Sequence, residues 1–564
     1  MICLALVPVL QLALNPNLFI NPSGDYIDPW LYTGCFVSFP AHLQLFGTTY
    51  YVTRLSWLLP GIAAHSLLPA LAANYVLHLG FFYALLFGTY ALISSGANRQ
   101  LALLGAMVMG WTPAIVAALS WDYVDGAGIV FLVLTLLCLE KSASSDRRGW
   151  LWAVAAGCGM ACMASSNLFL VTLAPIAMLF FAVRVGLAQW RAIFVAAAAA
   201  IAGTALMLGI FALVNHLYGG PWLFMAPSFA AARYVSANST VWRVTGWYQR
   251  ASWLALTLVA VSATLVDLVS SRRGRTRFGR ALQVTLLAAC AVWTAFEMRG
   301  PLLQLSYYAS YLVPLSVLAL LSQADFSNER FQRSSLGLAA VTSVAFVCGH
   351  WFFLTRTPGL ATTLSQFPLA VRAYHLLWFG TFTVDSFSTL LAVGGGVLAV
   401  VSLKLIPSRR VAWCGFVFGL AFGCAAVPDT WPSRANPNVK RSYEDAVAVD
   451  RYITGYVDGR SLRFWYDVKA FPTRSLRSIA STYFWGFSLV NERFPAMTAE
   501  EARLLPANTR FVFLVPTKDE IAKASQSLTQ HGLGLTVIGQ REFGDGDRTL
   551  SVILADLVRV DRPR

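Results

Sequence analysis

The chain has 564 residues, of which 57% are hydrophobic and 12% are charged. Soluble domains carry about a quarter charged residues, so this composition excludes an ordinary soluble protein and indicates a chain that lies largely in lipid. The net charge of +15 does not indicate nucleic-acid binding, because most arginines stand in short clusters between apolar stretches and no RNA- or DNA-binding motif accompanies them. The nine cysteines show neither a disulfide framework nor metal-ligand spacing.

Apolar stretches recur at near-regular spacing from residue 1 to about residue 427. Each is close to the ~20 residues that a helix needs to cross ~30 Å of hydrocarbon. The predicted spans are 1–20, 69–95, 101–118, 126–140, 150–165, 168–184, 192–215, 251–270, 281–297, 303–322, 335–354, 386–403 and 411–427. The sequence therefore predicts a polytopic α-helical membrane protein with about 13 transmembrane helices over residues 1–427. A small C-terminal α/β domain over residues 428–564 follows, where charges become frequent.

Basic residues gather in alternate connections between these stretches. They are Arg99; Lys141, Arg147 and Arg148; Arg184 and Arg191; Arg272, Arg273, Arg275, Arg277 and Arg280; Arg330 and Arg333; Lys404, Arg409 and Arg410. Positive loops mark the cytoplasmic side, so we expect a multi-pass protein of the plasma (inner) membrane with a cytoplasmic N-terminus and an extracytoplasmic C-terminal domain. Residues 1–14 lack the charged start and cleavage site of a signal peptide. This favours a short first span, or a start codon placed too late.

Two acidic clusters lie in the first two external connections. Asp25 and Asp28 stand in loop one (21–68), and Asp122 and Asp125 stand in the very short loop two. Carboxylates at span ends are costly unless they are solvated or paired, which makes them candidate functional groups. If the clusters converge, one carboxylate could act as general base while the other orients it or the substrate. The alternative is that these residues are solvated or cap the following helices, with Asp28 before Pro29.

Short motifs in these loops resemble a known family. Residues 28–32 (DPWLY), followed by residues 47–51 (GTTYY), resemble the first external loop of GT-C superfamily glycosyltransferases, in the branch of the protein O-mannosyltransferases and aminoarabinose transferases. Residues 125–127 (DGA), before a Phe- and Leu-rich span, resemble the second acidic motif of the family, and residues 311–315 (YLVPL) resemble a later stretch. The pattern covers about residues 1–330. Pro29 stands where the family typically has Glu, so any metal or pairing role of that carboxylate is lost. Ser310 stands where the family often has an Arg that contacts the donor phosphate, so this contact does not carry over to that position.

The resemblance implies an enzyme that takes a sugar from a polyprenyl-phosphate donor and transfers it, with inversion, to a hydroxyl of a glycan, lipid or protein acceptor. It implies catalytic roles for Asp28, as general base, and Asp125. Arginine suits the leaving phosphate because of its planar fork of donors, and Arg54 and Arg299 are the favoured candidates. Snorkelling of these arginines to lipid head groups is the alternative. The predicted substrate-binding residues are Asp25, Asp122, Tyr32, Tyr50, Tyr51, Arg54, Arg299, Tyr307 and Tyr308.

A metal cofactor has little support. His42 and His65 in loop one could bind a divalent metal, but no paired ligand spacing accompanies them. In the C-terminal domain, the spacing predicts helices over 442–457 and 518–530 and strands over 462–466, 511–515, 535–538 and 550–554. Acceptor binding, a passive lid and a partner contact are all open roles for this domain.

Two other functions compete with the glycosyltransferase. A polymerase or ligase of lipid-linked glycans is also polytopic, but it would carry Arg-rich external loops in place of the early Asp loop. A transporter or lipid flippase often shows repeats, broken helices and charges at mid-membrane. This chain shows no clear repeat, and its acidic residues lie at the ends of the spans, which favours the enzyme.

Overall fold

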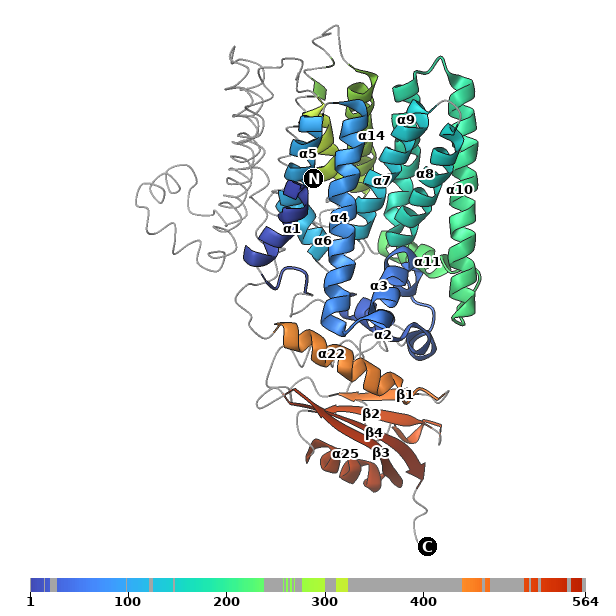
Figure 1. Cartoon of the computed structure of the whole chain (residues 1–564). Coiled ribbons are helices and arrows are strands. Elements are labelled where there is room, and N and C mark those ends of the chain that lie inside the picture. Colours follow the sequence, from blue (N-terminus) through green and yellow to red (C-terminus); the bar gives the residue numbers. More distant parts are fainter. Residues whose placement is uncertain are drawn as a thin grey trace, which may run out of the picture.

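The computed structural model describes residues 2–14, 16–20, 28–97, 99–120, 125–145, 148–237, six positions between 257 and 268, 276–299, 311–322, 439–458, 462–466, 502–506, 509–515, 519–544 and 549–559. The chain forms a helical bundle with a smaller unit of helices and strands at one end (Figure 1). The helices of the bundle are α1 (Ile2–Leu14), α4 (Ala70–Gly96), α5 (Arg99–Trp111), α6 (Pro113–Ser120), α7 (Asp125–Ser144), α8 (Gly149–Ser166), η2 (Leu168–Thr172), α9 (Leu173–Val185), α10 (Trp190–Leu217), α11 (Ala226–Ala237), α14 (Arg277–Arg299) and α16 (Leu312–Leu321).

Five helical segments in the described part of the chain are long and apolar enough to cross a membrane. They are Ala70–Gly96, Gly126–Ser144, Leu168–Val185, Trp190–Leu217 and Arg277–Phe296. Shorter apolar helices include Ile2–Ala13 and Leu312–Leu321. The predicted spans 335–354, 386–403 and 411–427 lie outside the described residues, as do most of 251–270 and the first part of 303–322. The count of thirteen therefore stays a prediction.

The prediction of one continuous span over 101–118 is wrong, because this stretch is divided into two helices. α5 ends at Trp111 and α6 begins at Pro113. Proline has no N–H and disfavours the helical conformation of the residue before it. Near the end of α5, the hydroxyl of Thr112 donates a hydrogen bond to the backbone carbonyl of Val108 at 2.7 Å.

Helices α8 and α10 pack at very close range through small residues. A Cβ added at Gly157 would lie 1.9 Å from the carbonyl oxygen of Ala200, and one added at Gly203 would lie 2.0 Å from that of Val154. The hydroxyl of Thr204 donates to the carbonyl of Gly157 at 3.0 Å. Small residues that allow backbones to approach are the usual basis of helix association in lipid. The outer face of α10 is exposed and apolar, as a lipid-facing surface requires; it includes Phe194, Val195, Ile201, Leu206 and Leu213.

The segment predicted as loop one is largely helical. The sequence had indicated only a short helix beginning at Pro29 in this segment. It contains α2 (Asp28–Phe46), η1 (Tyr51–Thr53) and α3 (Leu55–Leu67). α2 kinks at Ser38, just before Pro40, because proline cannot donate the next helical hydrogen bond. Gly47, at a φ of 68°, ends α2 in the left-handed conformation that glycine adopts without a steric penalty.

The C-terminal unit contains α22 (Val439–Thr454), β1 (Leu462–Tyr466), β2 (Arg510–Val515), α25 (Asp519–Gln530), β3 (Leu533–Phe543) and β4 (Leu550–Arg559). The strand order is β1-β2-β4-β3, with β1 parallel to β2 and the other pairs antiparallel. Alternate residues face opposite sides: Val512 and Leu514 pack with α22, while Phe511 and Phe513 pack with Leu528 of α25. The proposed division at residue 428 lies outside the described residues.

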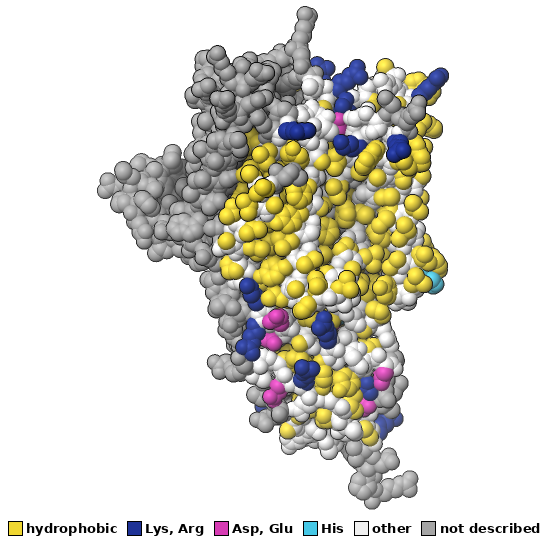
Figure 2. All heavy atoms as spheres, in the orientation of Figure 1, with side chains coloured by type: hydrophobic (Ala, Val, Ile, Leu, Met, Phe, Trp, Pro, Cys, Tyr) yellow, Lys and Arg dark blue, Asp and Glu magenta, His cyan; other side chains and the backbone are white. Residues whose placement is uncertain are grey.

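The two ends of the bundle differ in charge. The chain runs up and down through α7, α8, α9, α10 and α14 (Figure 1), so their basic residues meet at one end, which we call the basic end. These residues are Lys141, Arg148, Arg184, Arg191, Arg277 and Arg280. The C-terminal unit, with α2 and α3 beside it, occupies the opposite end, which we call the domain end. Figure 2 shows a band of hydrophobic side chains between the two ends.

Candidate functional site

Three stretches that are far apart in the sequence meet at the domain end of the bundle. The first is the start of α3, where the side chain of Arg54 donates through Nη1 to the carbonyl oxygen of Ser166, the last residue of α8, at 2.7 Å. The hydroxyl of Ser165 donates to the carbonyl of Thr53 at 3.0 Å and receives the backbone N–H of Ser56 at 3.3 Å. These bonds fix the buried Arg54 guanidinium, which is 8% exposed, against the end of α8.

The second stretch is the start of α16. The side-chain amide of Asn167 donates to the hydroxyl of Tyr311 at 3.1 Å, while its carbonyl oxygen accepts from the backbone N–H of Phe169. Asn167 directly follows Ser166, the acceptor for Arg54. Tyr311 and Arg54 are therefore held by adjacent residues at the end of α8.

The third stretch is the first turn of α7. A Cβ added at Gly128 would lie 3.1 Å from both Ser166 Oγ and Tyr311 Cε1, so the position three residues after Asp125 touches Tyr311 and the end of α8 that holds Arg54. This contact explains why a glycine occurs here in an otherwise apolar helix. Of the site residues predicted from the sequence, Asp125 and Arg54 thus belong to segments that the fold brings together.

The helices on either side of the acidic loop two are in direct contact. A Cβ added at Gly126 would lie 2.6 Å from the carbonyl oxygen of Ala118 and 2.9 Å from Leu119 Cα, so α7 begins in direct contact with the end of α6. His78 of α4, through Nδ1, donates to the carbonyl of Leu119 at 2.6 Å. The backbone before and after the loop is therefore fixed, and Asp125 is the first residue of α7.

Asp28 is the first residue of α2, so both predicted catalytic carboxylates stand at helix N-termini. Negative side chains are favoured there by the helix dipole, which is compatible with the capping alternative as well as with catalysis. The side chains of Asp28, Asp125 and Arg299 are not among those that the structure describes. Asp25, Asp122, Tyr307 and Tyr308 lie outside the described residues.

Arg299 is the last residue of α14, and the helix ends close to the same site. Phe296, one turn earlier, packs edge-to-face on Phe169 of η2 with ring centroids 5.3 Å apart. Phe169 in turn lies 6.5 Å from the ring of Tyr311. The last turn of α14, which carries Arg299, therefore lies at the domain end near η2.

Three of the five predicted tyrosines form an aromatic group between α2 and η1. The Tyr32 and Tyr51 rings pack edge-to-face at 5.5 Å, and the Tyr50 and Tyr51 ring centroids lie 4.0 Å apart. The guanidinium of Arg54 lies 5.8 Å from the Tyr50 ring centroid. Tyr32 is fully buried and Tyr50 is partly exposed. The packing of these rings stabilises the contact between α2 and η1, independently of any contact with substrate.

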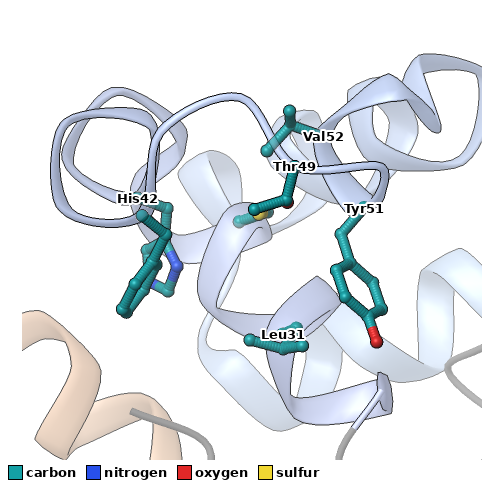
Figure 3. Close-up of a pocket in the computed structure, with 7 residues that line it drawn as sticks. Leu31, His42, Thr49, Tyr51 and Val52 are labelled. Carbon is teal, nitrogen blue, oxygen red and sulfur yellow. The ribbon is translucent and has the colours of Figure 1, made fainter. Parts of the chain in front are cut away.

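A small pocket opens between α2 and the 47–53 segment (Figure 3). Its lining residues are Leu31, Cys35, His42, Phe46, Thr49, Tyr51 and Val52. Burial raises the pKa of the Cys35 thiol above its ordinary value, and the nearby Asp450 carboxylate raises it further. Since the thiolate is the nucleophilic form, Cys35 acts here as an apolar lining group.

The two histidines of loop one bind the C-terminal unit, a role that the sequence reading missed. His42 Nε2 lies 2.7 Å from Oδ1 of Asp450, and His65 Nε2 lies 2.9 Å from the hydroxyl of Tyr443. His65 Nδ1 lies 2.9 Å from the carbonyl of Gly61, so it must donate there and Nε2 must accept from Tyr443. Within the described residues, no group of three or more His, Cys, Asp or Glu side chains could hold a metal ion.

No family model and no curated protein matches this chain. Two solved structures of ArnT from Cupriavidus metallidurans, an aminoarabinose transferase with the GT-C fold, are similar to it. The structure bound to undecaprenyl phosphate has 12% sequence identity and a TM-score of 0.45, and the apo structure has 12% identity and a TM-score of 0.40. Each alignment covers 97% of both chains.

Proposed function

We propose that this chain is a membrane glycosyltransferase that transfers a sugar from a polyprenyl-phosphate donor to an acceptor hydroxyl at the extracytoplasmic face. The observation that supports it is the meeting of three segments at one end of the bundle. The segments of Arg54, Asp125 and Tyr311 all contact the end of α8 there. The segments of Asp125 and Tyr311 carry part of the resemblance to the GT-C enzymes, and Arg54 follows the GTTYY motif by three residues. A shared site explains why these segments contain acidic, basic and aromatic residues.

In the proposed reaction, Asp28 is the general base. It takes the proton of the acceptor hydroxyl while the acceptor oxygen forms a bond to the anomeric carbon. The bond between that carbon and the donor phosphate oxygen breaks, and the lipid phosphate leaves with the electron pair. Because the acceptor attacks from the side opposite the leaving group, the anomeric configuration inverts. Asp125, at the start of a second helix, orients the reacting groups.

Two arginines supply positive charge for the leaving phosphate. Arg54 is buried and fixed by the carbonyl of Ser166, so its charge is already in place before the donor binds. A fixed cation stabilises developing negative charge without having to reorganise during the reaction. Arg299, at the end of α14, is the second candidate, and the last turn of its helix lies near η2.

The proposed orientation follows from the charge of the two ends. Positive residues mark the cytoplasmic side of membrane proteins, so the basic end faces the cytoplasm. The domain end, with α2 and α3, then lies at the extracytoplasmic surface. A lipid donor held in the outer leaflet would present its phosphate and sugar at this level.

The decisive experiment measures sugar transfer by the purified protein with a panel of labelled polyprenyl-phosphate sugars and a mixed acceptor fraction. We expect Asp28→Asn to lower transfer by about 100-fold or more, the usual contribution of a positioned general base. Glu444→Gln, an equivalent charge change at an exposed position of α22, serves as the matched control and should retain full activity.

Two results would contradict the proposal. Equal transfer by the wild type and Asp28→Asn would remove the assigned base. Movement of the donor lipid across a proteoliposome membrane without covalent transfer would instead identify a transporter.

A further inference from the structure

One helix of the C-terminal unit contacts both helices of loop one through polar bonds. Tyr443 and Asp450 of α22 are seven residues apart, so they project from the same face, two turns from each other. Tyr443 bonds to His65 of α3, and Asp450 bonds to His42 of α2. All four side chains are buried. Between the two polar contacts, Val447 of α22 belongs to the same apolar cluster as Ile20 and Phe46.

The His42 imidazole also lies directly against the other half of its own helix. α2 kinks at Ser38, which separates Gly34 in the first half from His42 in the second. A Cβ added at Gly34 would fall 2.2 Å from His42 Cε1, 2.5 Å from His42 Nε2 and 3.1 Å from Asp450 Oδ1. The imidazole therefore lies on the bare backbone of Gly34, and Asp450 reaches it there.

These contacts link the C-terminal unit to the direction of the first half of α2. The ring of His42, in the second half of the helix, lies against Gly34 in the first half, so a shift of the ring would press on the first half across the kink. The carboxylate of Asp450 accepts the Nε2–H of His42 and so fixes the ring. Asp28 and Tyr32 lie on the half whose direction is set in this way.

We propose that the Asp450–His42 pair is a positioning device, which lets the C-terminal unit hold the helix that carries the general base. This inference rests on the proposed function, and it assigns a role to a domain for which acceptor binding, a lid and a partner contact were open. His42 and Asp450 act through α2 and not on the substrate. The His65–Tyr443 bond likewise joins the last turn of α3, the helix that begins directly after Arg54, to the same helix α22.

The first test compares steady-state kinetics of full-length variants. Asp450→Ala removes the acceptor for His42, and we expect kcat to fall about ten-fold, as misplacement of a reacting group does, with KM for the lipid donor within about two-fold of the wild type. Asp450→Asn keeps an oxygen that accepts the Nε2–H and should recover most of kcat. Gly34→Ala, which leaves both members of the pair intact but displaces the ring, should lower kcat in the same way.

The control for these variants is Glu444→Ala, which changes an exposed neighbour on α22 and should leave kcat unchanged. A general loss of folding would lower both kcat and the yield of monodisperse protein. Such a loss would also appear in Asp450→Asn, whereas loss of the positioning contact alone would not. If Asp450→Ala does not yield folded protein, the test compares the other two variants: kcat should stay high in Asp450→Asn and fall in Gly34→Ala. Wild-type kcat in Gly34→Ala and Asp450→Ala would overturn the proposal.

A second test does not depend on transfer. Hydrogen–deuterium exchange of peptides from residues 28–37 should be faster in Asp450→Ala and Gly34→Ala than in the wild type, while exchange in α8 stays the same. If the wild type transfers no sugar but exchange in this segment rises, the proposed function fails and the positioning contact stands. If transfer occurs but neither exchange nor kcat responds, the positioning contact fails and the proposed function stands.

Discussion

Glu140 of α7 is fully buried at the basic end of the bundle and pairs with Arg184 of α9 through both of its carboxylate oxygens. The Nε–Oε2 and Nη2–Oε1 distances are 2.8 and 2.9 Å, the bidentate geometry in which guanidinium and carboxylate fit best. The hydroxyl of Ser144 also donates to Oε1 at 3.2 Å. A carboxylate in such a place is tolerable only while its partners remain.

We therefore expect Arg184→Ala to destabilise the protein by about 3 kcal/mol or more, because it leaves an uncompensated buried charge. The double variant Arg184→Ala with Glu140→Gln should recover a good part of that loss, since the amide is neutral. Thermal unfolding in detergent measures both. Equal stability of the two variants would show that the buried charge is not the cause.

At the residue scale, the sequence indicated which side chains are candidates for the reaction, but not which residues they contact in the fold. Arg54 was a candidate because it shares a loop with Asp28, and the structure places it in contact with Ser166. Ser166 and Asn167 went unnoticed because Ser and Asn at the end of a helix are typical of ordinary capping. A metal role for His42 and His65 was considered and set aside for lack of ligand spacing. Their actual partners could not be predicted, because they lie 408 and 378 residues away in the chain, a distance over which no spacing rule applies.

At the element scale, hydropathy located most of the described apolar helices but misread those that proline and glycine interrupt. α2 contains Pro40 and kinks at Ser38. α3 contains Pro60 and has only 13 residues, fewer than any of the five long apolar segments, which have 18 to 28. A window tuned to the thickness of a membrane therefore treated this region as a loop. The sequence prediction joined α5 and α6 into one span over 101–118. The break between them was missed because Pro113 interrupts the helix without lowering the hydropathy of the apolar stretch.

The contact between α8 and α10 gives a sharp test of helix packing. Gly203→Ala would place a methyl group about where the carbonyl of Val154 stands, and we expect a loss of about 1 to 3 kcal/mol from the resulting separation of the helices. Gly209→Ala is the matched control on the same helix, since a Cβ there meets nothing within 4 Å. It should be neutral or slightly stabilising, because alanine favours helix by up to ~1 kcal/mol over glycine. Unfolding midpoints of the two variants should separate clearly; equal values would contradict the close packing.

At the scale of the whole molecule, charge segregation between the basic end and the domain end carries the proposed orientation. Alkaline phosphatase, which is active only outside the cytoplasm, should be active when fused after Arg564 and inactive when fused after Ser145, in the connection between α7 and α8. Green fluorescent protein at the same two positions should give the opposite result. Activity of the phosphatase at Ser145 would reverse the proposed topology.

The C-terminal strands were predictable because their alternation is strong. β1 matches its predicted range, and β2 and β4 begin within one residue of theirs. β3 was predicted as 535–538 but runs from Leu533 to Phe543, because the irregularity between Val537 and Gly539 breaks the period of two. The way this unit sits on α2 and α3 could not be predicted, since it depends on side chains that meet only in three dimensions.

The bond between His42 and Asp450 also bears on biosynthesis. The ribosome completes α2 about four hundred residues before it reaches α22, so a nascent chain would enter the membrane with the base-carrying helix still unfixed. On the proposed arrangement, full activity comes only with the last quarter of translation, when α22 reaches α2. A chain that terminates early would then insert into the bilayer with a lower kcat than the complete protein.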